Sequence, residues 1–329
     1  MLQYSFHFDT ISKYRAELMG LAILGVLWGH LMNDTCQPLI FAQLARLVHT
    51  PGFLFLSGFG LYYSFSNNSD IHLFFKKRIA RLYIPFFIMV LPFFISLLVI
   101  GKCSFLQFCG YMTTLAFWYE GNYYAMWYVA VSIVLYAVFP LMYRAFFNKY
   151  DRPILFCGVF CFLMAGIIFF IQDIFPDYWK IVKFGLSRSY LFPIGCVCGY
   201  LAKKKTSVTW YYLLIYILVC GIIFSMRINT PVTRTMMGIP VVCILLDYLF
   251  DKNKNEKLKK LLSWFGKYSL ELYLLHMLIY FALRIFLELN GAVSISIGIV
   301  CGLFLCHPVS LFTKRIASLT DANRISNHI

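Results

Sequence analysis

The sequence predicts an all-α, polytopic membrane protein with about ten transmembrane helices in one bundle. Of its 329 residues, 61% are hydrophobic and only 13% are charged, whereas soluble domains average about 45–50% apolar and about 25% charged residues. The mean hydropathy is +0.74, and the apolar residues gather in runs near the roughly 20 residues that a bilayer-spanning helix needs. No soluble domain, internal repeat or low-complexity tract separates these runs. We therefore expect a single membrane domain over residues 1–329.

Ten apolar runs define the expected spans. They cover residues 15–33, 46–66, 80–100, 124–146, 153–172, 186–202, 209–226, 231–250, 264–288 and 292–313. Residues 103–120 are apolar enough for a re-entrant or interfacial piece, and counting them as a span would change the topology. The charged run 251–260 is expected to be a solvated loop.

The distribution of basic residues predicts the orientation. Alternate loops, beginning with the N-terminal side, carry 21 Lys and Arg residues against 7 on the opposite side. The positive-inside rule therefore places both termini in the cytoplasm. The membrane that we expect for this protein is the inner (plasma) membrane of the cell. The same bias accounts for most of the net charge of +15, so no nucleic-acid partner is expected. The cysteines lie mostly in apolar runs without metal-ligand spacing, so no metal site is expected either.

The first span has polar groups at both ends. Its apolar part, Leu18 to Met32, is about 15 residues or roughly 22 Å of helix, with Arg15 and Glu17 before it and His30 near its far end. Histidine is costly inside a membrane, so His30 is either a functional group or a core histidine bonded to a neighbouring helix. Asp34 stands one helical turn after His30, where it either orients the imidazole or merely forms the polar helix end.

Polar residues also occur at the second span, and basic residues follow it. His49 precedes the second span and lies toward the same side of the membrane as His30, so the two imidazoles are expected to share one cavity. Ser57 lies within that span, where helix packing is the alternative interpretation. Arg78 and Arg81, at i and i+3, point along one helix face and are suited to clamp phosphates; the alternative is a plain positive-inside anchor.

Five motifs resemble, in order, the acyltransferase 3 family of integral membrane acyltransferases. They are Arg15-x-Glu17-x-x-Gly20-x-Ala22 ending in His30, His49-x-Pro51 leading into Phe-Leu-Ser57-Gly58-Phe, Lys-Arg78-x-x-Arg81-Leu-x-x-Pro85, Met126-Trp127-Tyr128 opening a span that ends in Pro140, and Tyr268-Ser269-x-Glu271-x-Tyr273-x-x-His276. The matches extend from residue 15 to about residue 280. Each motif is loose by itself, and the specificity comes from their shared order.

The resemblance implies a membrane-bound O-acyltransferase. Such an enzyme moves an acyl group, often acetyl, from cytoplasmic acetyl-CoA or another acyl-CoA to a hydroxyl of a cell-envelope polysaccharide or lipid-linked glycan, without a bound cofactor. Together with the residue patterns it assigns the candidate sites by role. The catalytic candidates are His30, Asp34 and His49; the acyl-CoA-binding candidates are Arg15, Glu17, Arg78 and Arg81; the cavity or substrate candidates are Ser57, Trp127, Tyr128, Glu271, Tyr273 and His276.

One departure from the family pattern concerns the first span. Many members carry an arginine eleven positions before the histidine, where this chain has Met19. We expect Arg15, one turn earlier, to supply the displaced charge. Two other functions stay open: a transporter or flippase for an envelope intermediate, with histidines as proton relays, and an inactive acyltransferase-like sensor. Direct transfer and a covalent acyl-histidine also remain alternatives.

The charge bias leads to a topological prediction. A cysteine introduced into residues 251–260 should react with a membrane-impermeant thiol reagent only after the membrane is permeabilised. Reaction in sealed, right-side-out cells would reverse the expected orientation.

Overall fold

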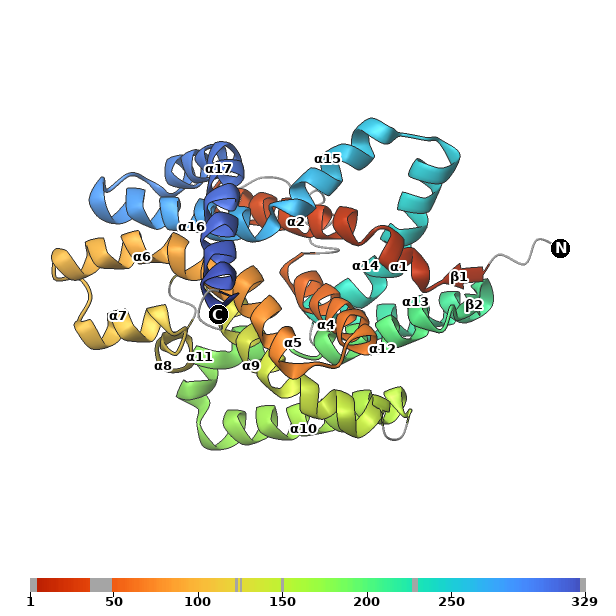
Figure 1. The fold of residues 1–329 in the computed structure, drawn as a ribbon. Helices are drawn as coiled ribbons and strands as arrows, with labels where there is room; N and C mark the ends of the chain where they lie inside the picture. Colours follow the sequence, from red (N-terminus) through yellow and green to blue (C-terminus); the bar gives the residue numbers. More distant parts are fainter. Residues whose placement is uncertain are drawn as a thin grey trace.

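The chain forms a bundle of helices with one small two-stranded sheet at its edge (Figure 1). The computed structural model describes residues 5–35, 49–121, 124, 126–148, 151–226 and 230–325, without the side chains of 33–35, 148, 230 and 320–325. The long elements are α2 (Arg15–Thr35), α4 (Thr50–Asn67), α6 (Ile84–Val99), α9 (Trp127–Tyr143), α10 (Pro153–Ile174), α12 (Leu191–Lys203), α13 (Trp210–Ser225), α14 (Thr230–Asp247), α16 (Ser269–Phe286) and α17 (Gly291–Ile325).

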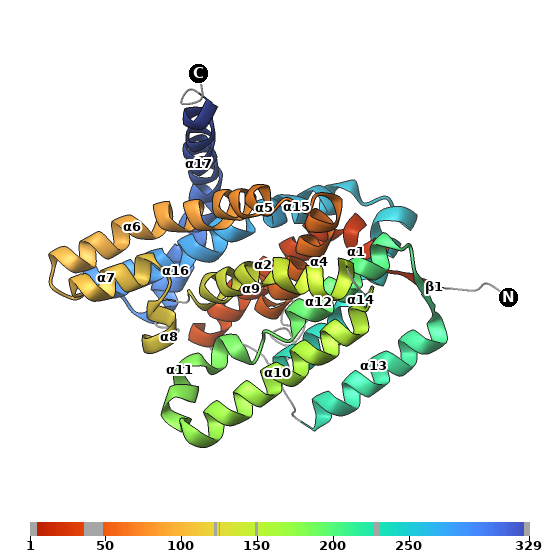
Figure 2. The same ribbon diagram turned by 60° about the horizontal axis from the view of Figure 1, so that its bottom comes forward.

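Shorter elements connect these helices. They are β1 (Ser5–His7), α1 (Asp9–Lys13), α5 (Ile71–Arg78), α7 (Phe105–Met112), α8 (Ala116–Glu120), α11 (Pro176–Leu186), β2 (Ser207–Thr209), α15 (Glu256–Lys267) and the π-helical turns η1 (Ile79–Tyr83), η2 (Arg144–Asn148) and η3 (Tyr248–Lys252). Figure 2 shows that the C-terminal part of α17 extends away from the bundle. Strands β1 and β2 are antiparallel, with Phe6 opposite Val208.

The predicted all-α membrane class is confirmed. Within the described residues, eight helices are long and apolar enough to cross a membrane. The two other expected spans, 46–66 and 209–226, coincide with α4 and with the 16-residue apolar helix α13. The expected interfacial piece at 103–120 contains the short helices α7 and α8. That all ten helices cross the bilayer remains a prediction.

One segment differs from its expected form. The charged run 251–260 is not a loop, because most of it belongs to η3 and to the amphipathic helix α15, whose apolar side packs against the bundle. The basic segment that contains Arg78 and Arg81 is helical, as their expected place on one helix face requires. Residues Ile71–Val99 form one continuous run, with the π-helical turn η1 between α5 and α6, and π turns inside helices often mark functional sites.

Glycines allow the closest helix contacts in the bundle. Helix α15 crosses α2 where Gly20 lies against the Leu262 carbonyl and Gly266 lies against the Ala16 carbonyl. An added Cβ at either glycine would overlap backbone atoms of the other helix. Membrane helices use such small residues because backbones then approach closely and gain van der Waals contact. This crossing fixes the N-terminal half of α2, which carries Arg15.

Polar contacts hold the segment just before α2. The hydroxyl of Tyr14 donates a hydrogen bond to Asp251 at 2.9 Å and another to Asp247 at 3.2 Å. The ammonium of Lys13 forms ion pairs with the same two carboxylates. The entry into α2 is therefore tied to the end of α14 and to η3.

The glycine crossing yields a stability prediction. Gly266→Ala should destabilise the protein by about 1–3 kcal/mol because the new methyl group overpacks the contact with Ala16. Gly158→Ala is the matched control, since no atom lies within 4 Å of a Cβ at that position of α10. Thermal unfolding in detergent compares the two variants, and equal midpoints would show that the α2–α15 contact is loose.

Candidate functional site

The candidate functional site extends along α2, which carries polar groups at both ends. Arg15 begins the helix and His30 follows fifteen residues later, about 22 Å away at 1.5 Å per residue. Helix α4 runs beside α2 in the opposite direction. Its N-cap residue His49 lies near Gly29, where an added Cβ would be 3.3 Å from His49 Nε2, and Gly60 near its other end lies against Arg15.

A cavity of about 140 Å³ lies at the Arg15 end of the bundle. We call it the arginine cavity. It is lined by Arg15, Met19, Phe53, Ser57, Arg78, Arg81, Leu82, Tyr128, Tyr136, Ser269, Leu270 and Tyr273. Arg15 and Arg81 are exposed and Arg78 is half-buried, so the cavity is open to its surroundings. No Asp or Glu is among these described lining residues, and the three guanidinium groups leave it strongly positive.

Glycine and a π turn place the three arginines. The Arg15 guanidinium donates a hydrogen bond from Nη2 to the Leu56 carbonyl at 3.3 Å. It lies directly against Gly60, where an added Cβ would be 2.6 Å from Nη2. Arg78 lies over the ring of Tyr136, 6.0 Å from its centroid, and η1 brings Arg81 to the same cavity.

Met19 also lines this cavity, one turn along α2 from Arg15. The two residues share one face of the helix, as the i, i+4 spacing requires. Arg15 thus places a guanidinium in the cavity that Met19 faces. The expected replacement of the family arginine remains a proposal, and this geometry supports it.

Aromatic rings separate the arginine cavity from the His30 end. Phe53, Tyr128 and Tyr273 contact one another, with ring centroids 5.6 Å apart for Phe53–Tyr128, 5.7 Å for Tyr128–Tyr273 and 6.5 Å for Phe53–Tyr273. The Ser57 and Tyr128 hydroxyls are hydrogen-bonded at 3.0 Å, and the Tyr136 hydroxyl donates to Ser57 at 3.3 Å. Sequence reasoning missed Tyr136, although it continues an i, i+4, i+8 polar stripe from Tyr128 through Ser132 on α9.

Three histidines lie at the other end of α2, where His30 contacts His276 and His49 lies beside the neighbouring Gly29; we call these three the histidine cluster. The rings of His30 and His276 have centroids 5.4 Å apart, and His49 lies beside Gly29. His276 is fully buried, and its Nδ1 lies 2.6 Å from the Leu272 carbonyl. Because a carbonyl only accepts, Nδ1 carries the proton, so the buried Nε2 of a neutral His276 is a hydrogen-bond acceptor. No hydrogen-bond partner for Nε2 is present among the described residues.

Other predicted site residues lie elsewhere or outside the description. Glu17 does not line the arginine cavity, because its buried carboxylate accepts a hydrogen bond from Ser263 of α15 at 2.7 Å. Glu271 is buried on α16 and Trp127 is buried on α9, and neither lines that cavity. The side chain of Asp34 lies outside the described residues.

In the part of the chain that the structure describes, no group of three His, Cys, Asp or Glu side chains is arranged to hold a metal ion.

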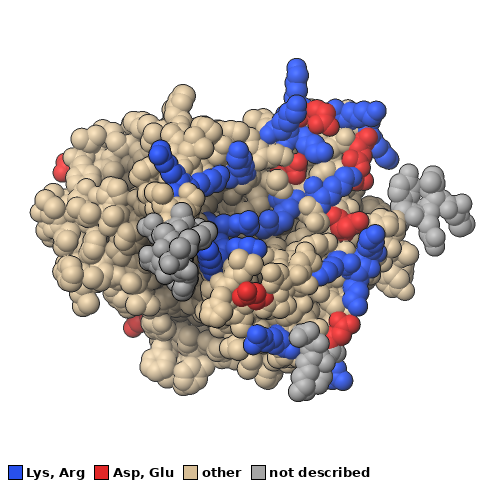
Figure 3. Space-filling view, in the orientation of Figure 1, with Lys and Arg blue, Asp and Glu red and all other residues tan. Residues whose placement is uncertain are grey.

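Positive charge extends from the arginine cavity over one face of the molecule. Lys and Arg gather over the middle and right of the face in Figure 3, whereas its left end is almost free of them. Lys76 and Lys77 of α5 and Lys257 and Lys260 of α15 are exposed. A polyanionic ligand approaching this face would be attracted over a wide area.

Comparisons with known proteins identify the family of the chain. No curated protein and no solved structure matches the chain. A family model described as an acyltransferase domain matches residues 18–312, nearly the whole chain. The match includes Arg78, Arg81 and the histidine cluster, and it begins just after Arg15. The chain therefore belongs to the acyltransferase 3 family of membrane acyltransferases.

Proposed function

We propose that this membrane acyltransferase transfers an acetyl or other short acyl group from acyl-CoA to a hydroxyl of a cell-envelope glycan or lipid-linked saccharide. The observation that carries the proposal is that arginines lie at one end of α2 and histidines lie at the other. Three arginines face one open cavity at one end of the helix, and a histidine cluster lies at the other. The first end suits a polyanionic donor and the second suits proton transfer.

The arginine cavity is the proposed binding site for the phosphates of the donor. Arg15, Arg78 and Arg81 have no acidic partner in the cavity lining, so an incoming phosphate supplies the missing negative charge. Hydrogen bonds between guanidinium and phosphate are charge-assisted and often bidentate. By the positive-inside rule this end faces the cytoplasm, where acyl-CoA is found.

The acyl arm of the donor then runs from the cavity toward the histidine cluster. Phe53, Tyr128 and Tyr273 lie on that path, and Ser57 and Tyr136 place hydroxyl groups beside it. We assign to these side chains the task of directing the thioester and excluding water from it. Exclusion of water would limit hydrolysis of the thioester when no acceptor is bound.

His30 is the proposed general base. Its imidazole takes the proton of the acceptor hydroxyl, the hydroxyl oxygen forms a bond to the thioester carbonyl carbon, and the carbon–sulfur bond breaks. The CoA thiolate leaves and receives the proton that His30 took. His276 is a positioning residue in this scheme, because its buried ring faces His30 and its own Nδ1 proton is committed to the Leu272 carbonyl.

The role of His30 leads to the first functional test. His30→Ala should lower acyl transfer by about 10² to 10⁴ in rate, since that is the usual contribution of general acid–base catalysis. His72→Ala is the matched control, because His72 is exposed on α5 away from the histidine cluster. The assay follows labelled acyl groups from acyl-CoA into envelope glycan at equal protein level. Activity of His30→Ala within tenfold of wild type would remove His30 from the chemistry.

The arginines give an independent test on the donor side. Arg78→Ala and Arg81→Ala should each raise the KM for acyl-CoA roughly ten- to a hundredfold and leave the KM for the acceptor nearly unchanged, since one charge-assisted contact is worth about 1.5–3 kcal/mol. Lys77→Ala removes a neighbouring exposed cation that does not line the cavity. It should leave both constants near wild type. A donor KM that is unchanged in both arginine variants would make these residues membrane anchors.

A further inference from the structure

A second, larger cavity lies on the opposite side of α4 from the arginine cavity. Phe53 and Ser57, four residues apart, face the arginine cavity, whereas Phe55 points the other way into this second cavity. Its volume is about 250 Å³. The lining residues are Phe6, Phe8, Ile11, Phe55, Ile194, Cys198, Leu201, Val208, Tyr212, Leu213, Tyr216, Met236, Ile239 and Pro240. We call it the apolar pocket.

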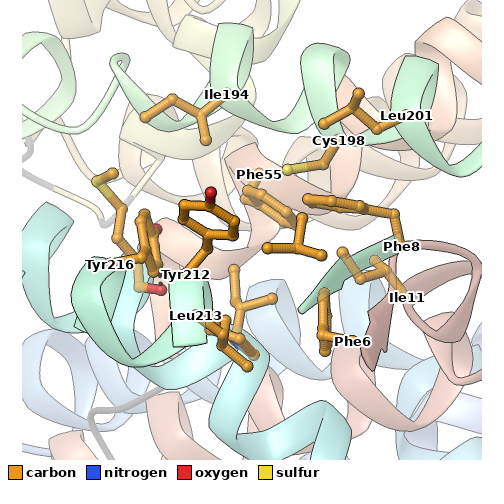
Figure 4. Close-up of a pocket in the computed structure, with 14 residues that line it drawn as sticks. Phe6, Phe8, Ile11, Phe55, Ile194, Cys198, Leu201, Tyr212, Leu213 and Tyr216 are labelled. Atoms are coloured by element: carbon orange, nitrogen blue, oxygen red, sulfur yellow. Dashed lines mark hydrogen bonds between the residues drawn. The ribbon is translucent and has the colours of Figure 1, made fainter. Parts of the chain in front are cut away.

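The side chains that line the apolar pocket come from the N-terminal segment, from β2 and from helices α4, α12, α13 and α14. Figure 4 shows Phe6 and Phe8 entering from the N-terminal segment, Phe55 from α4, and Tyr212 and Tyr216 from α13. No charged side chain is among the described residues that line it. A cavity with such walls offers too few polar partners for water, and left empty it forfeits dispersion contacts. A hydrocarbon ligand fits these walls.

The pocket opens beside a helix whose outer side is apolar. Tyr212 lines the pocket and yet has 63% of its surface exposed, so it marks the mouth. On the same helix, Tyr211 and Leu218 are 67% and 65% exposed. Figure 2 shows α13 at the edge of the bundle. Exposed apolar side chains along a membrane helix face the lipid, so the mouth at Tyr212 is reached from the bilayer.

The end of the pocket near Leu201 and Val208 has residues of the kind that contact lipid headgroups. Leu201 and Val208 line the pocket, and the turn between them carries the exposed Lys205. Its neighbours are already engaged, since Lys203 donates to Ser66 and Asn67 and Lys204 contacts Asp151. For Lys205 no acidic partner is present among the described residues. Trp210 and Tyr211, next along the chain, are exposed aromatic residues of the kind that gather at membrane interfaces.

We propose that the apolar pocket binds one acyl chain of a bilayer phospholipid with an anionic headgroup. The chain enters past Tyr212 and lies among Phe55, Cys198 and Leu213, and the phosphate is placed beside Lys205. Phe6, Phe8 and Ile11 close the pocket, and the same segment leads within a few residues to Arg15. The bound lipid thus supports the segment from which α2 begins.

Native mass spectrometry of the full chain tests this proposal, with phosphatidylglycerol as the probe in mild detergent. The wild type should retain one phosphatidylglycerol per chain. Cys198→Phe fills the pocket and should lower that retention at least tenfold. The matched control is Leu218→Phe, which adds an aromatic ring on the exposed side of α13 and should retain the lipid. Lys205→Gln should weaken retention of phosphatidylglycerol more than retention of zwitterionic phosphatidylcholine.

A second measurement does not depend on the folding of the filled variant. Added phosphatidylglycerol should raise the thermal unfolding midpoint of the wild type until the rise saturates, because a ligand that binds only the folded state stabilises it. Palmitoyl-CoA is the competing probe. Displacement of the retained lipid by palmitoyl-CoA at lower concentration than by phosphatidylglycerol would assign the pocket to a long acyl donor. Absence of retained lipid in the wild type, or equal retention in wild type and Cys198→Phe, would overturn the proposal.

Discussion

The arrangement depends on three positive charges that share one cavity without a carboxylate. Arg15, Arg78 and Arg81 approach one another from two separate parts of the chain. No acidic side chain among the described lining residues offsets their mutual repulsion. The Arg15 guanidinium also has a fixed place against Gly60 and the Leu56 carbonyl. An anionic ligand is the partner that this cavity lacks, and the family to which the chain belongs suggests that acyl-CoA supplies it.

Helix α2 connects this cavity to the histidine cluster. It is held by the glycine crossing with α15 at one end and lies beside α4 and α16 toward the other. Both ends of the site are thereby fixed on one rigid element, which suits a reaction that needs donor and acceptor in a constant relation. The aromatic layer of Phe53, Tyr128 and Tyr273 fills the space between them. We propose that the donor binds at the Arg15 side of the membrane and that the acyl group is transferred near the His30 side.

Much of the fold was predictable because a helix that crosses a bilayer needs a long apolar run, and such runs are visible in the sequence. The elements that were missed depend on weaker local signals. The charged run 251–260 has a polar sequence, and the residues that pack its helix against α2, Leu262 and Gly266, come after it in the chain. The three-residue strands β1 and β2 pair across the chain, and such short strands leave almost no pattern. Glu17 was expected at the donor, yet Ser263 of a distant helix holds its carboxylate.

The candidate site was predictable in its residue types and less so in its contacts. Arg78 and Arg81 could be paired from their i, i+3 spacing, and they do line one cavity. His276 of α16 contacts His30 of α2. No local sequence pattern predicts a contact between residues so far apart in the sequence. His49 lies beside α2 because Gly29 has no side chain, and the cavity that His30 and His49 were expected to share remains a prediction.

We propose that donor binding and acyl transfer occur at opposite ends of α2 within one chain. Proteoliposomes with the chain in one orientation test it directly, with labelled acetyl-CoA supplied only at the Arg15 side and a glycan acceptor only at the His30 side. Labelled acceptor is expected on the His30 side, with CoA released on the Arg15 side. Transfer that requires donor and acceptor on the same side of the membrane would contradict it.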